Sequence, residues 1–455
     1  MKTYEVVVLG SGAGASIASR AVSAGLSTAL IDKGPLGGTC VNTGCIPSKM
    51  LIYPADLIET LNNMGKVGVE AQLISIHFSE IMDRMRQVRA RNSEYTRSWI
   101  REHSSGLDFY QGEGRFLDDH VIEVNDTAIR GNRIFLCTGA RPLIPPVEGM
   151  DTIPFHTNET ILELTQPPHD MVIIGGGYIA TEYAHFFAAM GTEVTIIQRN
   201  QRLLPAEDEE ISTVLFEALE KRMTILTGTE VTSLVRKGEI IQVIGKNTKT
   251  GEPVQIPAGT VLVATGRRSN ADTLHLENTG IKTDKKGYIL TNEYLETSVE
   301  NIWAVGDANG KQMFRHAANR EALIAWHNAT SPEKVAMNYR AVPHAVYTFP
   351  RIASVGMTGE LARKDHLVMV GRTSYADITK GEAMREEAGF ARVIVDRDNR
   401  TILGFHIIGP EAPILIQEIA NAIMNGETVD SLAGIHIHPS LSELIPATLK
   451  HLEEG

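Results

Sequence analysis

The sequence has little cysteine, no long apolar run and no excess of positive charge. Only 3 of its 455 residues are cysteine, which excludes the disulfide framework of a small secreted protein. No stretch approaches the roughly 18 consecutive apolar residues that a membrane helix requires, and the N-terminus lacks the layout of a signal peptide. The net charge of -12 argues against nucleic acid as a partner, because that binding requires clustered lysine and arginine. We therefore expect a soluble, cytoplasmic protein with neither a membrane nor a nucleic-acid partner.

The chain is long enough for about three domains, and it repeats one pattern. Residues 4–32 have the pattern of a strand, a glycine-rich turn, a helix and a second strand, and the same order returns over residues 170–200. Such units bind dinucleotides, so we expect two Rossmann-like α/β domains. After Pro343 the sequence predicts strands followed by a helix, "PILIQEIANAIMNG", in a third domain of α+β type. Between the two repeated units, apolar residues at helical spacing predict a packed helix: Phe78, Ile81, Met82, Met85 and Val88.

The first glycine cluster has the form G-x-G-x-x-G/A, with Gly10, Gly12 and Ala15 at the three positions. Glycines permit the tight turn and the close approach of a pyrophosphate to the N-terminus of the following helix. Asp32 ends the next strand, where a carboxylate can accept hydrogen bonds from a ribose. This cluster therefore predicts a dinucleotide site.

The second cluster differs from the first at the end of its second strand. The same three positions are occupied by Gly175, Gly177 and Ala180. Where an acid would bind the ribose, however, the strand ends in Gln198 and Arg199, with Arg202 nearby. No carboxylate repels a 2′-phosphate there, which favours NADPH over NADH. The alternative is that both arginines are solvated surface charges.

The stretch "GGTCVNTGCIPSK" contains two of the three cysteines, Cys40 and Cys45. On a regular helix, residues five apart point to different sides, so these two can meet only if the backbone is distorted, and Gly44 and Pro47 favour that distortion. A zinc site would be two ligands short, because Cys137 lies in an apolar strand as a buried thiol. A structural disulfide closing so small a loop would add little stability. A redox-active pair is the preferred interpretation.

The C-terminal stretch "HIHPSLSELIP" supports two interpretations. Ser440 and Glu443 have the spacing of a capping box at the start of the last helix. Alternatively, His438 is an acid/base group that Glu443 orients, because thiol exchange needs a proton carrier near pH 7. The residues alone leave both open.

Together these motifs resemble the class I pyridine nucleotide-disulfide oxidoreductases, the flavoproteins that include dihydrolipoamide dehydrogenase, glutathione reductase, mercuric reductase and mycothione reductase. The resemblance covers essentially the whole chain. "GGTCVNTGCIPSK" is similar to the redox-disulfide motif of the group, "GGGYIATE" to its nicotinamide motif, "NIWAVGDANG" to its second flavin motif and "HPSLSE" to its C-terminal catalytic motif. It implies an FAD-binding domain at 1–147, an NAD(P)H-binding domain at 148–270, a segment at 271–341 that returns to the FAD domain, and a C-terminal dimerisation domain at 342–455.

The resemblance also implies the site residues. FAD would be held by Gly10, Gly12, Ala15, Asp32, Thr39, Lys49, Gly114, Gly139 and Asp307. NADPH, or else NADH, would be held by Gly175, Gly177, Tyr178, Ala180, Glu182, Arg199, Arg202 and Gly266. Tyr178 would cover the nicotinamide side of the flavin, and Lys49 would pair with Glu182. No metal is implied.

In the implied mechanism, hydride passes from NAD(P)H to the flavin and then to the cysteine pair. Cys45 would be the sulfur next to the flavin, and Cys40 would exchange with the substrate. His438, held by Glu443, would serve Cys40 of the other subunit, so the resemblance implies an obligate homodimer. His436 would be structural.

The motifs of this chain resemble two different enzymes of the group. "CIPSK" and "HPSLSE" resemble dihydrolipoamide dehydrogenases, which implies a small dithiol or a lipoyl-bearing partner and allows a role as a docked subunit of a larger complex. "IIQRNQRLL" and "FRHAANREALIAWHN" resemble mycothione reductases, which implies NADPH and a low-molecular-weight disulfide. Mercuric reductase fits poorly, because no cysteine follows Cys137.

Overall fold

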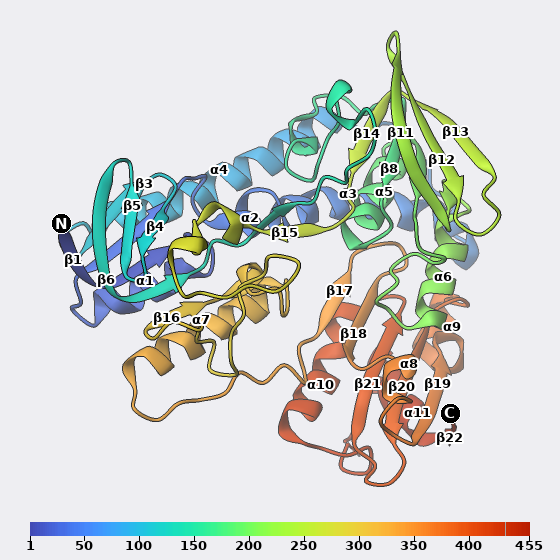
Figure 1. Ribbon diagram of the computed structural model, residues 1–455. Helices are drawn as coiled ribbons and strands as arrows, with labels where there is room; N and C mark the ends of the chain where they lie inside the picture. Colours follow the sequence, from blue (N-terminus) through green and yellow to red (C-terminus); the bar gives the residue numbers. More distant parts are fainter. Residues whose placement is uncertain (433) are drawn as a thin grey trace. The chain divides into compact units, whose positions relative to one another are not determined.

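The computed structural model describes residues 1–432 and 434–455, which form two compact units (Figure 1). The first unit consists of Met1–Met50, Met82–Leu143 and Gly266–Asn338. The second unit consists of Leu51–Ile81, Ile144–Thr265 and Tyr339–Gly455. Two of the boundaries between them, after Met50 and after Ile81, fall within the long helices α3 (Cys45–Asn63) and α4 (Phe78–Glu102). Each unit is therefore assembled from separate stretches of the chain.

A largely parallel sheet forms the centre of the first unit. The parallel strands lie in the order β3-β2-β1-β6-β16, and β5 and β4 extend the sheet in antiparallel pairing. Its strands are β1 (Lys2–Leu9), β2 (Thr28–Asp32), β3 (Leu107–Gln111), β4 (Arg115–Asp118), β5 (Val121–Val124), β6 (Thr127–Leu136) and β16 (Ile302–Ala304). Val6, Val7 and Val8 have no exposed surface, as expected for a parallel strand that is covered on both faces.

Two helices pack together beside this sheet, α1 (Gly14–Ser23) and α7 (Arg315–Thr330). Residues from the 271–308 segment join Val7 and Leu9 in one hydrophobic core. A small antiparallel pair, β7 (Ala140–Pro142) with β15 (Arg267–Ser269), completes the unit. The chain after residue 266 thus returns to the sheet that the N-terminal residues began.

The second unit contains another parallel sheet, with the strand order β10-β9-β8-β14. Its strands are β8 (Asp170–Ile174), β9 (Glu193–Ile197), β10 (Thr224–Leu226) and β14 (Thr260–Val263). Helix α5 (Tyr178–Ala189) packs on β8 and β9. An antiparallel sheet stands beside it (Figure 1), formed by β11 (Thr229–Lys237), β12 (Ile240–Asn247) and β13 (Pro253–Ala258). Helix α6 (Glu209–Leu219) begins at Asp208, whose side chain accepts a hydrogen bond from the Glu210 N–H.

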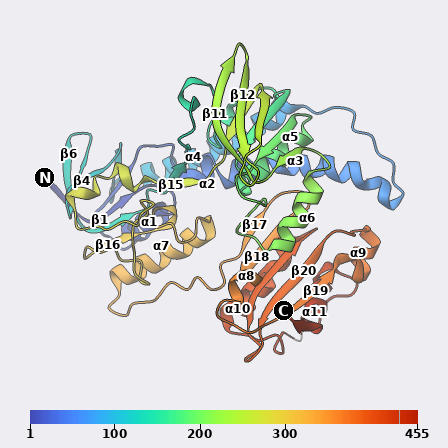
Figure 2. The ribbon, with the colours of Figure 1, turned by 45° about the vertical axis from the view of Figure 1, so that its right-hand side comes forward.

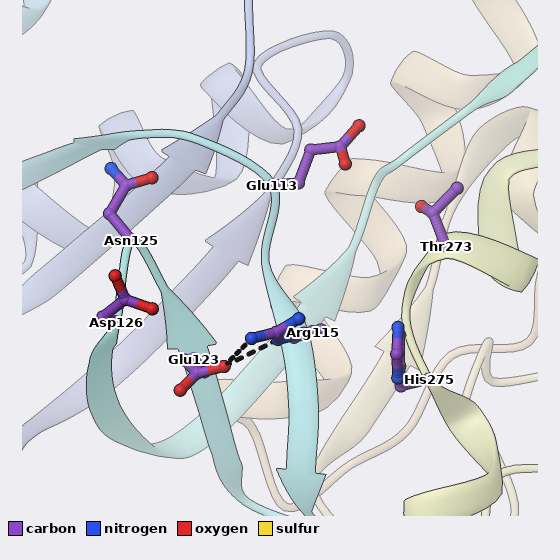
Figure 3. Close-up of a pocket in the computed structure, with 7 residues that line it drawn as sticks. All are labelled: Glu113, Arg115, Glu123, Asn125, Asp126, Thr273 and His275. Carbon is purple, nitrogen blue, oxygen red and sulfur yellow. Dashed lines mark hydrogen bonds and ion pairs between the residues drawn. The ribbon is translucent and has the colours of Figure 1, made fainter.

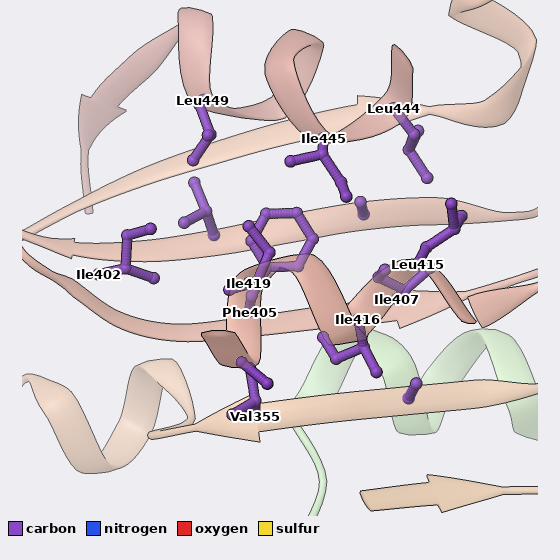
Figure 4. Close-up of a cluster of buried hydrophobic side chains, with 14 of the residues drawn as sticks. Val355, Ile402, Phe405, Ile407, Leu415, Ile416, Ile419, Leu444, Ile445 and Leu449 are labelled. Carbon is purple, nitrogen blue, oxygen red and sulfur yellow. The ribbon is translucent and has the colours of Figure 1, made fainter. Parts of the chain in front are cut away.

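The C-terminal part of this unit is an antiparallel sheet of six strands in the order β17-β18-β21-β20-β19-β22. These strands are β17 (His344–Val346), β18 (Ile352–Gly356), β19 (Val368–Ser374), β20 (Phe390–Asp396), β21 (Ile402–Ile408) and β22 (Leu452–Glu454). Helices α10 (Ala412–Asn425) and α11 (Leu444–Lys450) bury apolar residues against it, around Phe405 (Figure 4). Helix α6 also contacts β21 and lies next to this sheet (Figure 2).

The remaining helices are short: α2 (Gly38–Asn42), α8 (Gly359–Ala362) and α9 (Thr379–Met384). In α4 the predicted apolar face is confirmed, since Phe78, Met82 and Met85 are buried. In the part of the chain that the structure describes, no helix is long and apolar enough to cross a membrane. The predicted fold class, two Rossmann-like sheets followed by an α+β domain, is confirmed. The predicted domain boundaries stay predictions.

Candidate active site

The first glycine-rich turn joins β1 to α1. Gly10 has a φ of +100°, and a Cβ there would overlap the carbonyl oxygen of Cys137, so only glycine fits. Asp32, at the end of β2, accepts hydrogen bonds from the backbone N–H of Ser11 at 2.5 Å and from that of Gly34 at 2.6 Å. The structure therefore brings a carboxylate together with the glycine turn and the N-terminus of α1.

The other glycines expected to hold FAD lie in the same unit. Gly12 approaches the start of α2 so closely that a Cβ at Gly38 would lie 2.7 Å from the Gly12 Cα. Gly139 has a φ of +67° with open space where its Cβ would stand, whereas Gly114 is closely packed against side chains of the sheet. The next position of the first motif, Ala15, is the second residue of α1.

A buried arginine links further candidates in this unit. The Arg267 guanidinium donates a hydrogen bond to the carbonyl oxygen of Ala140, and it lies 3.5 Å from the Thr39 Oγ1 and 3.4 Å from the Asp307 Oδ2. Burial raises the pKa of Asp307 above its ordinary value, although Arg267 opposes that shift. Sequence reasoning missed Arg267; the signal for it was its position directly after Gly266 in "ATGRRSN". An open glycine turn, a strand-end carboxylate and a buried cation with a carboxylate together fit the diphosphate, ribose and ribityl groups of FAD.

The backbone breaks between the two cysteines, as predicted. Helix α2 ends at Asn42, and α3 begins at Cys45. Thr43 between them has a φ of -142°, outside the helical region. This break lets residues five apart approach each other, and both thiols are free in the structure.

The two thiols are hydrogen-bonded to each other, which separates their acidities. The hydrogen bond from Cys45 lowers the pKa of Cys40 to about 7, and the positive charge of Arg315 contributes to that lowering. The same hydrogen bond raises the pKa of Cys45. The hydrogen bond therefore favours Cys40 over Cys45 as the thiolate. Cys137, directly after β6, is buried, and burial raises its pKa, which agrees with the predicted inert thiol.

Arg315 is a second residue that sequence reasoning missed. It is the first residue of α7, and its Nη1 lies 3.9 Å from the position that a Cβ at Gly12 would take. It stands in the quoted stretch "FRHAANREALIAWHN", but no motif assigned it a role. Its guanidinium thus lies near the glycine turn, and its charge acts on Cys40.

The second glycine turn joins β8 to α5 and repeats the geometry of the first. Gly175 has a φ of +123°, and a Cβ there would overlap the carbonyl oxygen of Ala264. Around Gly177 nothing lies within 4 Å of a Cβ position, which leaves room for a dinucleotide diphosphate. Tyr178 begins α5 and is 36% exposed, and Ala180 is buried. These residues fit a second dinucleotide.

At the end of β9, the uncharged Gln198 lies against this turn. Gln198 is buried, and its Cγ lies 2.8 Å from the position of a Cβ at Gly176. Arg199 is exposed. Arg202, in contrast, donates two hydrogen bonds of 3.0 Å to the carboxylate of Glu360. Of the two predicted arginines, Arg199 is thus exposed to solvent, whereas Arg202 is bound to a carboxylate.

Three of the predicted site residues, Lys49, Glu182 and Gly266, do not all belong to the same compact unit. Glu182, in α5 of the second unit, is buried and accepts a hydrogen bond from the Tyr347 N–H at 3.0 Å. Lys49 and Gly266 belong to the first unit. The pairing of Lys49 with Glu182 stays a prediction.

His438 and Glu443 form both of the arrangements that the sequence left open. One carboxylate oxygen of Glu443 lies 2.8 Å from the His438 Nδ1, and the other accepts a hydrogen bond from the Ser440 N–H at 3.0 Å. The capping box starts a 3-10 turn, Leu441–Glu443, directly before α11 rather than α11 itself. The hydrogen bond with His438 lowers the pKa of Glu443. A carboxylate that stays ionised orients the imidazole, whose side chain is 67% exposed.

The sequence matches the family "Pyridine nucleotide-disulphide oxidoreductase" over residues 4–328 and the dimerisation domain of that family over residues 342–448. The chain belongs to this family. It is an FAD-dependent NAD(P)H disulfide oxidoreductase, and the match to the dimerisation domain supports a homodimer. The predicted family and enzyme class are confirmed.

Several family members with known names are similar over nearly the full chain. Dihydrolipoyl dehydrogenase from Synechocystis sp. is 33% identical over 98% of this chain and 98% of its own length. Mycothione reductase from Mycobacterium tuberculosis is 30% identical over 99% of both chains. Mercuric reductase from Staphylococcus aureus is 33% identical over 94% of this chain but over 78% of its own length. The solved structure of a Cu(II) complex of the HOCl-induced flavoprotein disulfide reductase RclA from Escherichia coli superimposes with a TM-score of 0.87, at 28% identity and 99% coverage of both chains.

One surface hollow lies elsewhere in the first unit (Figure 3). It is lined by Glu113, Arg115, Glu123, Asn125, Asp126, Thr273 and His275. None of the predicted site residues of this disulfide oxidoreductase lines it. In residues 1–432 and 434–455 there is also no group of three or more His, Cys, Asp or Glu side chains that could hold a metal ion.

Proposed function

We propose that this disulfide oxidoreductase uses NADPH to reduce a small disulfide, with Cys40 as the thiol that attacks the substrate. The observation that carries the proposal is the break between α2 and α3, which lets Cys40 and Cys45 approach each other, and the hydrogen bond from Cys45 lowers the pKa of Cys40 to about 7. A thiol with a pKa near the ambient pH is close to the optimum for attack on a disulfide.

In the proposed reaction the Cys40 thiolate attacks one sulfur of the substrate. The substrate disulfide breaks, a mixed disulfide with Cys40 forms, and the first thiol leaves and takes up a proton. Cys45, once deprotonated, then attacks the Cys40 sulfur, which forms the Cys40–Cys45 disulfide and releases the second thiol. Both substrate sulfurs end reduced, and the enzyme dithiol ends oxidised.

His438 of the partner subunit would supply and remove these protons. The Glu443 carboxylate, 2.8 Å from the His438 Nδ1, leaves the Nε2 to face the substrate thiol. Ile435 and Ile437, which precede His438, are strongly exposed in the single chain, and a dimer would cover such apolar side chains. We therefore propose an obligate homodimer in which each active site takes its histidine from the other subunit.

The choice of NADPH rests on the second glycine turn. Gln198 presents no negative charge where a ribose-binding acid would stand, and Arg199 is exposed directly after it. A 2′-phosphate would meet a cation there instead of a carboxylate. Gly175, Gly177 and Ala180 would bind the diphosphate of the nucleotide.

When bound, FAD would supply the hydride transfer that links NADPH to the cysteine pair. Thr39 and Asp307 would hold its ribityl and diphosphate groups, and Arg267 would keep both in place. Lys49 would stand beside the isoalloxazine ring in an ion pair with Glu182, and Tyr178 would cover the nicotinamide face. Gly266 would contact the nucleotide.

The experiment is a panel of disulfides assayed with NADPH and with NADH. Glutathione disulfide, a mycothiol-type disulfide, coenzyme A disulfide and lipoamide are each tested with the purified holoenzyme. We expect turnover of at least one low-molecular-weight disulfide, a higher kcat/KM for NADPH than for NADH, and a reduced preference in Arg199→Glu. A preference of the wild type for NADH would contradict the nucleotide choice.

The second candidate is oxidation of a dihydrolipoamide group, and the reversibility of the dithiol exchange supports it. The similarity to a dihydrolipoyl dehydrogenase over 98% of both chains favours this direction. The substrate would then be a lipoyl-bearing protein, and the chain would dock in a larger complex. Co-purification with a lipoyl-bearing partner and faster turnover of dihydrolipoamide with NAD than of any free disulfide would select this candidate.

A further inference from the structure

The turn that carries Arg199 and Arg202 is folded against the second glycine turn. The Leu204 N–H donates a hydrogen bond of 2.8 Å to the carbonyl oxygen of Gly176, and the Gln198 side chain packs on the same glycine. Both ends of the 198–204 segment therefore contact the dinucleotide turn, and the two arginines lie between these ends.

Arg202 is engaged by a residue from the C-terminal domain. Its Nη1 and Nη2 each donate a hydrogen bond of 3.0 Å to a different oxygen of Glu360, and its side chain is 28% exposed. Glu209 lies farther away, with 4.0 Å between its Oε2 and the Arg202 Nη1. A guanidinium that already makes a bidentate contact with a carboxylate cannot offer the same fork to a phosphate.

Glu360 is held in this position by the packing around it. It lies in α8, and the Thr358 side chain caps this helix through the Leu361 N–H. The adjacent Gly359 N–H donates a hydrogen bond to the Asp208 Oδ2 at 3.3 Å. The cap of α8 and the hydrogen bond to Asp208 therefore hold Glu360 in the position from which it contacts Arg202.

More contacts between the same two domains fix the segment that follows Arg202. The Glu207 carboxylate is buried, lies 2.5 Å from the His344 Nε2, and accepts a hydrogen bond of 2.7 Å from the Ser354 Oγ. Arg392 forms an ion pair with Asp208 at 3.5 Å. Glu360 is more exposed than the carboxylates of Glu207 and Asp208 in these neighbouring contacts.

We propose that Glu360 is a specificity-determining residue for the nucleotide: it competes with the 2′-phosphate of NADPH for the guanidinium of Arg202. This inference rests on the proposed use of NADPH. Arg199 then provides the available positive charge, and Arg202 contributes only when it releases Glu360. The preference for NADPH is consequently lower than two free arginines would give.

The test is Glu360→Gln in the holoenzyme, which keeps the shape of the side chain and removes its charge. We expect kcat/KM for NADPH to rise about two- to fivefold, within the range that an exposed ion pair supports, with kcat/KM for NADH unchanged. In an Arg202→Gln background, Glu360→Gln should have no effect. Glu94→Gln removes the same charge from an exposed ion pair with Arg101 in the first unit, and it should change neither value.

A binding measurement separates recognition of the phosphate from other effects. Adenosine 2′,5′-bisphosphate and adenosine 5′-monophosphate are titrated into the wild type and into Glu360→Gln and Glu360→Ala. Tighter binding of the bisphosphate alone supports the proposal, and a purely structural role of Glu360 would alter both ligands equally. Unchanged or weaker bisphosphate binding in both variants overturns it.

The wild-type preference and the Arg199→Glu variant report separately on the proposed function. Suppose that the wild type prefers NADPH, that Arg199→Glu reduces this preference, and that Glu360→Gln has no effect. In that case only the inference about Glu360 fails. If the wild type prefers NADH and Arg199→Glu has no effect, the proposed nucleotide choice fails and the inference fails with it.

Discussion

The two glycine turns have nearly the same backbone and different surroundings. Gly10 and Gly175 have φ values of +100° and +123°, and each would place a Cβ on a carbonyl oxygen of a neighbouring segment. The strands that follow end in Asp32, whose carboxylate bonds to its own turn, and in the uncharged Gln198, which packs on its turn. In the proposed function, each turn provides a place for a diphosphate, whereas the residue at the strand end selects the ribose.

The cations near the two turns differ as well. Beside the first turn, Arg315 approaches Gly12, and its charge lowers the pKa of Cys40. Beside the second turn, Arg202 is bound by Glu360. In the proposed function, the first turn therefore combines cofactor binding with the chemistry of the thiols, and the second provides nucleotide recognition.

The largest effects are expected from filling each turn with a methyl group. Gly10→Ala and Gly175→Ala combine an unfavourable φ with overlap on a carbonyl oxygen, which we expect to cost roughly 2–4 kcal/mol locally. Gly10→Ala should lose bound FAD. Gly175→Ala should retain FAD and lose reduction by NADPH.

The absorbance ratio of flavin to protein and stopped-flow reduction by NADPH distinguish these outcomes. Gly65→Ala is the control, because nothing lies within 4 Å of a Cβ there. Loss of FAD from both variants would show that the two turns are not independent.

The second largest effect is expected when the second turn is given an acidic residue at the strand end, as the first turn has in Asp32. Gln198→Glu places a carboxylate beside the 2′-phosphate position, and like charges in contact cost several kcal/mol at most. We expect kcat/KM for NADPH to fall about 30-fold while that for NADH falls little or rises. Steady-state kinetics with both nucleotides measure this change, with Gln255→Glu on exposed β13 as the control. Equal loss with both nucleotides would mean that Gln198 acts through packing rather than charge.

Removing the charge from the first turn should have a smaller effect. Asp32→Asn weakens a charge-assisted acceptor, worth about 1.5–3 kcal/mol when both partners are well placed, and part of that bonding persists through the amide oxygen. We expect FAD to bind about tenfold more weakly, with the KM for NADPH unchanged.

Titration of the apoprotein with FAD, followed by fluorescence, gives this affinity. Asp126→Asn, at an exposed position with a φ of +60° that asparagine tolerates, is the matched control. An altered KM for NADPH in Asp32→Asn would contradict the assignment of Asp32 to the first site.

The smallest effect concerns the thiol beside the first turn. The hydrogen bond from Cys45 and, to a smaller extent, the positive charge of Arg315 lower the pKa of Cys40 to about 7. Arg315→Gln should therefore raise the pKa of Cys40. A thiol is reactive above its pKa and protonated below it, so alkylation of the reduced protein by iodoacetamide at pH 7 should slow about threefold and recover at pH 9. Arg315→Lys should behave as the wild type.

The pH profile of alkylation is measured in the Cys45→Ser background, which leaves one reactive thiol, and wild type and variant are compared within that background. Arg320→Gln, an exposed change in the same helix, is the control. An unchanged midpoint in Arg315→Gln would show that Arg315 does not lower the pKa of Cys40.

Much of the fold could be predicted because its signals are local. The strand, turn, helix and strand order around Gly10 and Gly175 is a pattern of adjacent residues, and a positive φ at a crowded position admits only glycine. The break between Cys40 and Cys45 could also be predicted, since Pro47 and Gly44 act on the backbone within one turn of the helix.

The residues that were missed act across long distances in the sequence. Arg267 meets Thr39 from 228 positions away, and Glu360 meets Arg202 from 158 positions away. A charged residue on its own gives no pattern that indicates its partner, so only the packing of the domains reveals these pairs.

The sequence by itself determined the family, the two dinucleotide turns, the identity of the cysteine pair and the absence of an acid at the end of β9. Tertiary structure alone decided which arginine is exposed and which is bound by Glu360, and which cation acts on Cys40. The physical reason is that backbone conformation is set by neighbours in the chain, whereas the electrostatic state of a side chain is set by whichever charges the fold brings within a few ångströms.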